Sequence, residues 1–459
     1  MSVAEYLKEF TFEQRDEFSR KQIAEKVSTL LTSTVDVSPM VIDGSWGTGK
    51  SEFCHKLINL MREADSHHLI YVDAFQADHA DEPLLTVLAE VIKILPDEEA
   101  QQSFIQKALP AARYGLKTLG KAAVGHLLKQ EAADVVDGFE KEIQQVANKA
   151  IDVSVEAMIK DHVKASESLA TLQATLKEIA GEKPIVLFID ELDRCRPNFA
   201  VHMLEIIKHT FDVDGVQFVL ITNTQQLKAS INHCYGDSVQ AQSYLDKFIK
   251  FTFSLSKNVQ VNRFDEIDAA KKHFSLLVES SPLLSETLLA RDNSSALALV
   301  RRCIEHNKLS LREVERLVRY LKVYQELTES SLNCHARLSN NHHTFYIIKV
   351  YAVCLSSILP GVANEVISQQ SDAKSLVSLI GLTMLPSFEG EARVFVHDMI
   401  ATLLAQECEF NKSNYLPSEA VKERFDDQKQ MYFQGDFTPD EGDLIKALRS
   451  SLKNLSLMA

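Results

Sequence analysis

The sequence predicts an α/β core with a central parallel sheet, a long helical insert within that core and an α-helical C-terminal lobe. Three observations predict this fold class. Short apolar runs suited to buried strands alternate with helical patterns in the first part of the chain. A glycine-rich loop separates one of these strands from the helix after it. Beyond residue 255 the periodicity is mainly helical.

The composition is that of an ordinary globular protein, with 45% hydrophobic and 25% charged residues among 459. This length leaves room for roughly two or three domains. Acidic residues outnumber basic ones by 64 to 49, which gives a formal net charge of -15. Because an overall negative field repels phosphate backbones, a nucleic-acid partner is not expected unless basic residues gather on one face.

The cysteines, the N-terminus and the most apolar stretch indicate where in the cell we expect the protein. The seven cysteines are widely spread without a C-x-x-C pair, so we expect reduced thiols in a cytoplasmic protein. The N-terminal "MSVAEYLKEF" is charged and is not typical of an export signal. The stretch "FYIIKVYAVCLSSILP" contains Lys349 and ends at Pro360, well short of the ~20 apolar residues that a membrane span needs. We expect a buried core helix there.

Residues 44–51, "GSWGTGKS", follow the pattern G-x-x-x-x-G-K-[ST] of a phosphate-binding loop, or Walker A motif. "PMVID" before it is typical of a strand, and "SEFCHKLINLM" after it of a helix. Backbone N–H groups of such a loop surround a β-phosphate. Lys50 would reach the β- and γ-phosphates, and the Ser51 hydroxyl would bind Mg²⁺. The predicted nucleotide-binding residues are Gly44, Trp46, Gly47, Thr48, Gly49, Lys50, Ser51 and Glu52.

A second strand with an acidic end is predicted within "PIVLFIDELDRCR". The continuous apolar run 185–189 is typical of a parallel strand buried on both faces. Asp190 and Glu191 follow at its carboxyl end, where α/β sheets bind their ligands. We expect Asp190 to hold Mg²⁺ together with Ser51, and Glu191 to polarise the attacking water. This second motif, Walker B, predicts hydrolysis of a nucleoside triphosphate.

Further polar residues follow these strands. Arg194 or Arg196 would stabilise transition-state charge as an arginine finger, or an Asp193–Arg194 pair would only shape the loop. A third strand, "GVQFVLIT", ends at Thr222 and is followed by Asn223. These polar groups would either orient the water as a sensor of the γ-phosphate or cap the end of the strand.

Taken together, these motifs resemble the KAP family of P-loop NTPases. The resemblance rests on "GSWGTGKS", "FIDELDRCRPNFAVHMLEIIK" and "SYLDKFIKFTFSLS", and also on "DEFSRKQIAEKVSTLL" and "YVDAFQADHADEPLLTVLAEVI". It covers the chain to about residue 325 and implies a P-loop NTPase core with an extra strand between the phosphate-loop strand and the acidic strand. It also implies ATP and Mg²⁺ as ligands and kinship with STAND signalling ATPases.

Two departures from the family concern the insert and the base. Many relatives carry membrane-spanning helices between the Walker motifs, where this chain has an insert that cannot span. The family commonly has aspartate where Glu191 stands, so the role of Glu191 rests on analogy with other ATPases. Trp46 belongs to the family pattern, but no chemical need for it is evident.

The insert, residues 101–165, is predicted to be helical. Four basic residues fall on one helical stripe: Arg113, Lys117, Lys121 and Lys129. This stripe is either a solvated face or a contact surface for an anionic membrane or an acidic partner. Apolar residues from Ala132 to Ala157 alternate in steps of four and three, which predicts a heptad seam. The seam packs either within the insert or on a second subunit.

The expected domains are a core of residues 1–100 and 166–255, the insert, a helical lid at 256–335 and a C-terminal helical domain at 336–459. "SLREVERLVRYLKVYQEL" predicts a helix. As in related ATPases, its Arg312 or Arg316 would touch the γ-phosphate, or both belong to a solvated face. The predicted catalytic residues are Lys50, Glu191, Arg194, Asn223 and Arg312.

The resemblance implies a regulatory ATPase that acts as a nucleotide-controlled switch or assembly module. Several bacterial members are tied to phage exclusion, which implies an antiviral role. Since the chain has no motif of a nuclease, protease or deaminase, we expect a separate effector protein. We also expect a homo-oligomer of the chain. Two alternatives stay open. A ring-forming, AAA+-like motor would need an aromatic pore loop, and a non-hydrolysing ATP-bound scaffold would tolerate Glu191→Gln.

Overall fold

The computed structural model describes residues 11–80, 82–116, 155–256, 258–260, 266–333, 340–387, 394–433 and 442–457. The chain divides into two compact units, Met1–Ser256 and Lys257–Ala459. The side chains of the basic stripe and of the heptad seam predicted for the insert lie outside the described residues. None of the described helices is long and apolar enough to cross a membrane.

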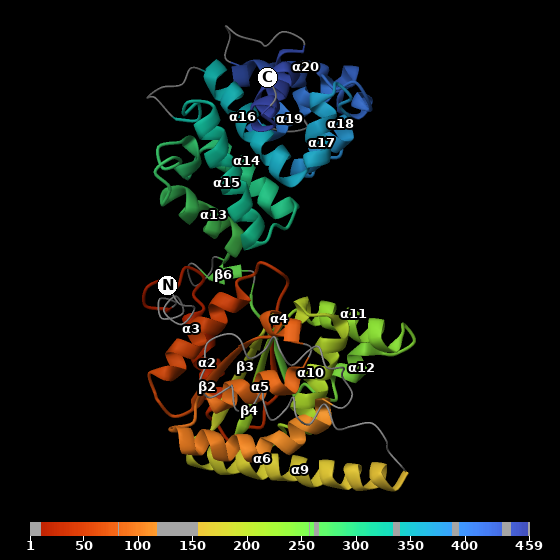
Figure 1. Cartoon of the computed structure of the whole chain (residues 1–459). Helices are drawn as coiled ribbons and strands as arrows, with labels where there is room; N and C mark the ends of the chain where they lie inside the picture. The colour runs from red at the N-terminus through yellow and green to blue at the C-terminus, as the bar shows by residue number, and fades with distance from the viewer. Residues whose placement is uncertain are drawn as a thin grey trace. The chain divides into compact units, whose positions relative to one another are not determined.

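Within the described residues, the first unit is built on a parallel sheet whose strands β2, β3 and β4 are labelled in Figure 1. The sheet has five strands in the order β2-β3-β4-β1-β5. The strands are β1 Met40–Asp43, β2 His68–Asp73, β3 Ile185–Asp190, β4 Val216–Thr222 and β5 Phe251–Ser254. Every residue of β3 is buried, as its unbroken apolar run predicts. Because β4 lies between β1 and β3, the expected extra strand is present and the predicted α/β P-loop core is confirmed.

The register brings the carboxyl ends of the strands together at one edge. Asp43 of β1 pairs with Thr222 of β4, and Asp73 of β2 pairs with Asp190 of β3. Since the strands are parallel, the segments that leave them start from the same edge of the sheet. The glycine-rich loop after β1, the turn of residues 191–194 after β3 (the acidic turn) and Asn223 after β4 therefore lie at the same edge of the sheet.

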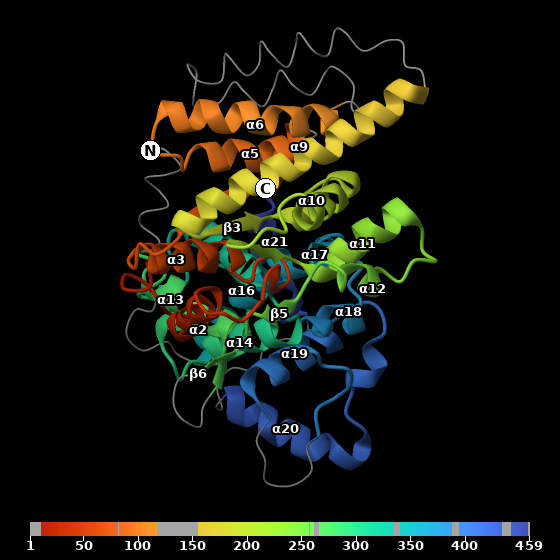
Figure 2. The same cartoon turned by 90° about the horizontal axis from the view of Figure 1, so that it is seen from below.

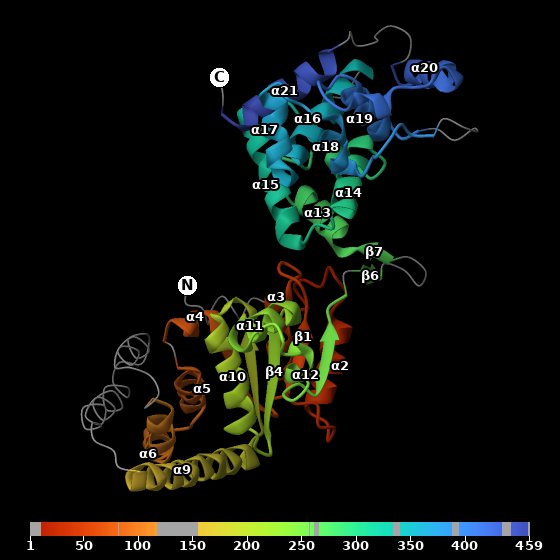
Figure 3. The same ribbon diagram turned by 90° about the vertical axis from the view of Figure 1, so that its right-hand side faces the viewer.

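Helices cover both faces of this sheet, as Figure 3 shows with α2 on one side and α5, α6 and α10 on the other. They are α2 Lys21–Leu31, α3 Lys50–Arg62, α4 Ala74–Ala77, α5 Pro83–Ile92, α6 Glu98–Leu116, α9 Val155–Glu182, α10 Pro197–His209, α11 Thr224–Tyr235 and α12 Ala241–Leu245. Alternate residues of β3 face the two layers. Val186 and Phe188 pack with α2 and α3, whereas Leu187 and Ile189 pack with α5, α9 and α10.

The predicted helical insert begins and ends in helices that belong to the core layer. α6 and α9 pack along each other (Figure 2), and α5 packs against both α6 and α10. Phe104 of α6 and Leu172 of α9 are buried in the same apolar cluster. The described ends of the insert are therefore anchored on the face of the sheet opposite α3.

The second unit is mainly helical and starts with a short antiparallel pair, β6 Asn258–Gln260 and β7 Glu266–Asp268. Its helices are α13 Ala269–Glu279, α14 Ser295–His306, α15 Leu311–Leu327, α16 Asn340–Ile358, α17 Pro360–Ile367, α18 Ala373–Val377, α19 Val396–Gln406, α20 Glu419–Phe433 and α21 Asp443–Leu455. The apolar stretch expected to be a core helix is α16, against which α14, α15, α17 and α21 pack. Ser310 and Glu313 form a capping box at the start of α15.

Candidate functional site

The loop between β1 and α3 has the backbone that its glycines predict. Gly47 and Gly49 have φ angles of 74° and 78°, in the left-handed region that favours glycine. The Thr48 hydroxyl donates to the Ser45 carbonyl at 2.9 Å, which closes the loop on itself. α3 begins directly after Gly49, so the N–H groups of its first turn lie at the end of the loop. This arrangement suits a phosphate group.

The Lys50 side chain lies over this loop. Its Nζ donates to the backbone carbonyls of Gly44 at 2.6 Å and Ser45 at 3.2 Å. Burial lowers the pKa of the ammonium group, although the carboxylates of Asp193 and Asp190 oppose that shift. The amine is therefore held inside the loop that is predicted to bind phosphate.

Asp190 ends β3 and is almost fully buried. Its Oδ1 accepts from the Glu191 backbone N–H at 2.8 Å, and its Oδ2 accepts from the Tyr71 hydroxyl at 3.2 Å. The Ser51 hydroxyl also bonds to this carboxyl group. Burial raises the pKa of Asp190, whereas the bonds from Ser51, Glu191 and Tyr71 lower it. The two residues predicted to bind Mg²⁺, Ser51 and Asp190, are thus in direct contact.

The donor atoms of this pair fit Mg²⁺. A hydroxyl and a carboxylate are hard oxygen ligands, and Mg²⁺ is usually held by one or two carboxylates together with substrate phosphates. No cluster of three or more His, Cys, Asp or Glu side chains suited to a metal occurs in the part of the chain that the structure describes. The pair therefore suits an ion that arrives with a nucleotide, and a cage built by the protein alone is not seen in that part.

Glu191 occupies the turn after β3 in a left-handed conformation, with φ of 60°. This value is uncommon for a residue other than glycine, and such strained positions often occur at functional sites. Its carboxylate pairs with the Arg194 guanidinium at 2.8 Å. Burial raises the pKa of Glu191, and Arg194 opposes the shift. The ion pair considered between Asp193 and Arg194 does not form, because Arg194 pairs with Glu191.

The other arginine considered as a finger, Arg196, has a different partner. Its Nε lies 3.1 and 3.2 Å from the two carboxylate oxygens of Asp78, and a terminal guanidinium nitrogen donates to the Asp78 backbone carbonyl. Asp78 is buried beside the N-terminus of α10, where it also accepts from the Arg196 backbone N–H. Of the two arginines, Arg194 is therefore the one at the acidic turn.

Trp46 connects the glycine-rich loop to the acidic turn. Its indole Nε1 donates to Asp193 Oδ2 at 2.6 Å, and the Thr222 hydroxyl donates to the other oxygen of that carboxylate at 3.3 Å. Asp193 is 9% exposed, whereas Trp46 is 49% exposed. The contact gives Trp46 a role that its sequence pattern did not indicate, because it fastens the loop to the segment after β3.

Asn223 begins the segment after β4 and caps the helix that follows. Its Oδ1 accepts from the Gln225 backbone N–H at 3.1 Å. Asp43, at the end of β1, accepts from the Thr224 backbone N–H at 2.8 Å and from the Ser254 hydroxyl at 3.3 Å. The capping contact is the second of the two roles considered for Asn223, and the sensor role stays a prediction.

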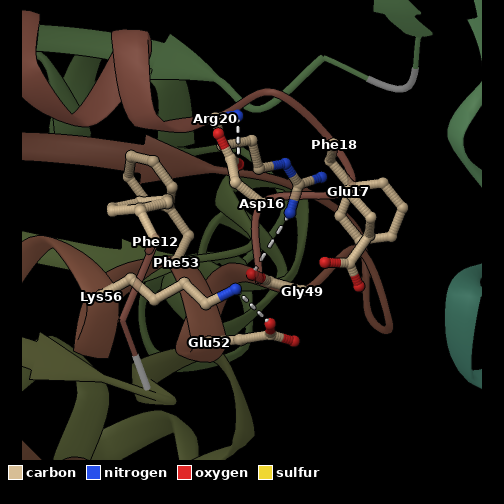
Figure 4. Close-up of a pocket in the computed structure, with 9 residues that line it drawn as sticks. All are labelled: Phe12, Asp16, Glu17, Phe18, Arg20, Gly49, Glu52, Phe53 and Lys56. Carbon is tan, nitrogen blue, oxygen red and sulfur yellow. Dashed lines mark hydrogen bonds and ion pairs between the residues drawn. The ribbon is translucent and has the colours of Figure 1, made fainter. Parts of the chain in front are cut away.

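Arg20 and Tyr71 contact the site although no motif indicated them. The Arg20 guanidinium donates to the backbone carbonyl of Thr48 at 3.0 Å. It also donates to the Gly49 carbonyl at 3.5 Å (Figure 4). It is buried and lies over the Phe18 ring, 4.9 Å from its centroid. Because its partners are main-chain atoms, no side-chain pattern in one sequence could have identified it.

The remaining predicted residues have simpler surroundings. Glu52, in the first turn of α3, pairs with Lys56 at 2.7 Å. Arg312 and Arg316 are exposed on α15 of the second unit. Their contact with a γ-phosphate stays a prediction.

Comparison with known proteins agrees with this geometry. None of the curated proteins compared with the chain matches it. A sequence profile described as the KAP family P-loop domain matches residues 20–328, which is more than half of the chain. The match includes the phosphate loop, the acidic turn after β3 and helix α15. The chain therefore belongs to the KAP family of P-loop NTPases.

Proposed function

We propose that the protein is a Mg²⁺-dependent ATPase whose nucleotide state acts as a switch or controls assembly. The observation that supports this most strongly is the meeting of Lys50, Ser51, Asp190 and Glu191 at one edge of the sheet. The loop amine and the helix terminus supply positive charge, and the acidic turn supplies carboxylates. Hydrolysis of a phosphoanhydride needs positive charge to stabilise the phosphate oxygens and a carboxylate to orient the attacking water.

In this proposal the chain's own residues position the triphosphate and the attacking water. The Lys50 ammonium moves from the Gly44 and Ser45 carbonyls to the β- and γ-phosphate oxygens. Ser51 and Asp190 would hold the Mg²⁺ ion, which neutralises charge on the phosphates when it is bound. The Trp46–Asp193 contact keeps the loop against the acidic turn during this exchange.

Glu191 is the proposed base or orienting group for water. Its burial raises its pKa toward the range in which a carboxylate accepts a proton effectively. The Glu191–Arg194 pair holds the carboxylate in place, and Arg194 is free to stabilise charge on the γ-phosphate when that pair opens. Asn223 would orient the water, and Arg312 of α15 would report the nucleotide state to the helical unit.

The biological role rests on the family resemblance. We propose a cytoplasmic regulator in bacterial anti-phage defence, which forms a homo-oligomer and acts through a separate effector protein. The free state of the described cysteines agrees with a reducing compartment.

The proposal is tested by ATP binding with and without Mg²⁺, measured by calorimetry on the full chain. Lys50→Ala should abolish binding, whereas Lys177→Ala, which removes an exposed lysine paired with Asp214, should leave it unchanged. Equal binding by wild type and Lys50→Ala would overturn the assignment of the site.

A further inference from the structure

Helix α15 of the second unit has an exposed face that combines arginines with apolar side chains. Arg316, Tyr320, Val323 and Leu327 are spaced by four, three and four residues, so they lie on one side of the helix, and Arg319 lies beside them. Tyr320 is 36% exposed, and Val323 and Leu327 are each 44% exposed. The opposite side of α15 is buried in the unit. We call these five residues the basic surface of α15.

The two arginines of the basic surface are not neutralised by a neighbour. Neither guanidinium forms an ion pair or a hydrogen bond within the described part of the chain. The adjacent carboxylate, Glu315, lies 3.2 Å from His273 of α13. The whole chain has a net charge of -15, so unpaired arginines beside exposed apolar side chains stand out from the rest of its surface. They indicate a contact with a partner that is acidic and partly apolar.

Helix α20 carries the opposite charge on its exposed side. Four carboxylates lie on this side at spacings of three and four residues: Glu419, Glu423, Asp426 and Asp427. Within the described part of the chain only Glu419 has an ion-pair partner, Lys422 at 3.6 Å. Met431, one turn after Asp427 on the same side, is 51% exposed. The four carboxylates and Met431 form the acidic surface of α20.

The two surfaces match in charge and in the order of their side chains. On α15 the arginines precede Val323 and Leu327, and on α20 the carboxylates precede Met431. One alignment of the two helices therefore brings opposite charges together and places apolar side chains against each other. In such a contact the charge pairs give specificity, and the burial of apolar surface contributes to affinity.

The two surfaces lie on different sides of the unit. Figure 3 shows α15 and α20 at opposite sides of the second unit, and α20 packs against α16. A copy cannot bring its own two surfaces together, and two copies cannot pair both surfaces with each other at once. A contact between them is therefore head-to-tail, with α15 of one copy on α20 of the next. Contacts of this kind build rings or open filaments.

We propose that the basic surface of α15 binds the acidic surface of α20 in a second copy of this chain, and that repetition of this contact builds the homo-oligomer. The inference rests on the homo-oligomer of the proposed function and names its surfaces. Arg312, the proposed reporter of the nucleotide state, lies one turn before Arg316 on the same side of α15. This position gives the nucleotide a route to control assembly.

The test is sedimentation velocity of the full chain with Mg²⁺ and ATP, at a protein concentration near the midpoint of wild-type assembly. Arg316→Gln with Arg319→Gln removes the charge of the basic surface. Glu423→Gln with Asp427→Asn removes charge from the acidic surface. Each double variant should raise the dissociation constant by about tenfold, because two exposed ion pairs are lost. Raising the salt concentration to about 0.5 M should weaken wild-type assembly in the same direction.

A mixture of the two double variants tests the head-to-tail arrangement. Each variant keeps one intact surface, so the acidic surface of one binds the basic surface of the other. The mixture should stop at one-to-one dimers, because the remaining two surfaces of each dimer have lost their charges. This rescue also shows that both variants are folded. As a matched control, Lys446→Gln with Lys453→Gln removes two exposed positive charges from α21 and should assemble like wild type.

The other outcomes separate this inference from the proposed function. If both double variants assemble as tightly as wild type, or if their mixture stays monomeric, the two surfaces are wrong while the homo-oligomer stands. If wild type is monomeric at every concentration, the surfaces and the homo-oligomer both fail. Binding of a fluorescent oligonucleotide or a polyglutamate peptide to monomeric wild type through Arg316 and Arg319 would give the basic surface another partner and overturn the proposal. ATP binding by calorimetry tests the nucleotide site separately.

Discussion

The indole nitrogen of Trp46 donates to the Asp193 carboxylate at 2.6 Å, across 147 residues of sequence. Asp193 is buried, and the Thr222 hydroxyl is its other hydrogen-bonding partner at this edge of the sheet. The phosphate loop, the acidic turn and the end of β4 are therefore joined through one carboxylate.

Trp46→Phe should destabilise the first unit. The substitution keeps an aromatic ring but leaves one oxygen of a buried carboxylate without its donor, which costs about 1.5–3 kcal/mol in the free energy of unfolding. Urea unfolding followed by circular dichroism measures the change. Asp193→Asn and the double variant complete a double-mutant cycle, which measures the coupling energy between Trp46 and Asp193. A coupling energy near zero would show that the contact contributes nothing to stability.

Trp46 should also report nucleotide binding directly. It is the only tryptophan in the chain and about half of its surface is exposed. Its fluorescence therefore reports the environment of the loop without a contribution from other indoles. Addition of Mg²⁺ and ATP should shift its emission in wild type and leave it unchanged in Lys50→Ala. An identical shift in both proteins would mean that the signal comes from elsewhere than the phosphate loop.

Tyr71→Phe should raise the Mg²⁺ concentration needed for half-maximal ATP turnover by several-fold. The hydroxyl that donates to Asp190 at 3.2 Å is lost, so the carboxylate is less firmly oriented toward the ion. A Mg²⁺ titration of the turnover rate measures this effect. Tyr235→Phe, which removes a hydroxyl bonded to Glu205, serves as the control. Equal Mg²⁺ dependence in both variants and wild type would contradict the role of Tyr71.

The pH dependence of turnover should follow Glu191 and respond to Arg194. Since burial raises the pKa of Glu191 above its usual 4.5, turnover should rise with pH through that higher value as the carboxylate ionises. Arg194 lowers this pKa, so Arg194→Ala should move the acidic limb to higher pH, while Arg194→Lys keeps most of the wild-type profile. A limb that moves to lower pH in Arg194→Ala would contradict the pairing.

Asp190→Asn should make the protein more stable but unable to gain stability from Mg²⁺ and ATP. A carboxyl whose folded-state pKa is raised contributes fully to stability below its usual pKa of 3.8, and loses that contribution as pH rises through the folded-state value. At neutral pH the ionised Asp190 therefore lowers stability. Without nucleotide at neutral pH, the variant should melt a few degrees above wild type. The difference between the two melting temperatures should be smaller near about pH 4. A lower melting temperature at neutral pH would contradict this account.

The sequence supported correct predictions wherever local pattern determines structure. The unbroken apolar run of β3 correctly predicted a buried strand. The glycines at positions 47 and 49 correctly predicted a loop with left-handed backbone angles. Ser51 and Asp190 could be assigned to one site because both follow parallel strands, although their direct contact needed the structure. The position of β4 between β1 and β3 came from family resemblance, since periodicity does not encode strand order.

Contacts between distant segments were not predictable. Trp46 and Asp193 lie far apart in the chain, and neither residue type alone indicates an indole–carboxylate bond. The considered pair of Asp193 with Arg194 was wrong because neighbouring side chains in the short turn after β3 point in different directions. Arg194 reaches back to Glu191, three residues earlier, and Asp193 faces the loop. The partners of Arg20 are main-chain carbonyls. Because every residue type has such a carbonyl, this contact could not be predicted from residue types in a single sequence.

The most direct test of the account is steady-state ATP turnover of the purified chain with Mg²⁺, measured at several protein concentrations beside Lys50→Ala and Glu191→Gln. The account predicts slow turnover in wild type that rises with protein concentration or on addition of an effector, and no turnover in either variant. Turnover of wild-type magnitude in Glu191→Gln would contradict the assigned chemistry. Rapid turnover that is independent of concentration would contradict the switch and favour a motor.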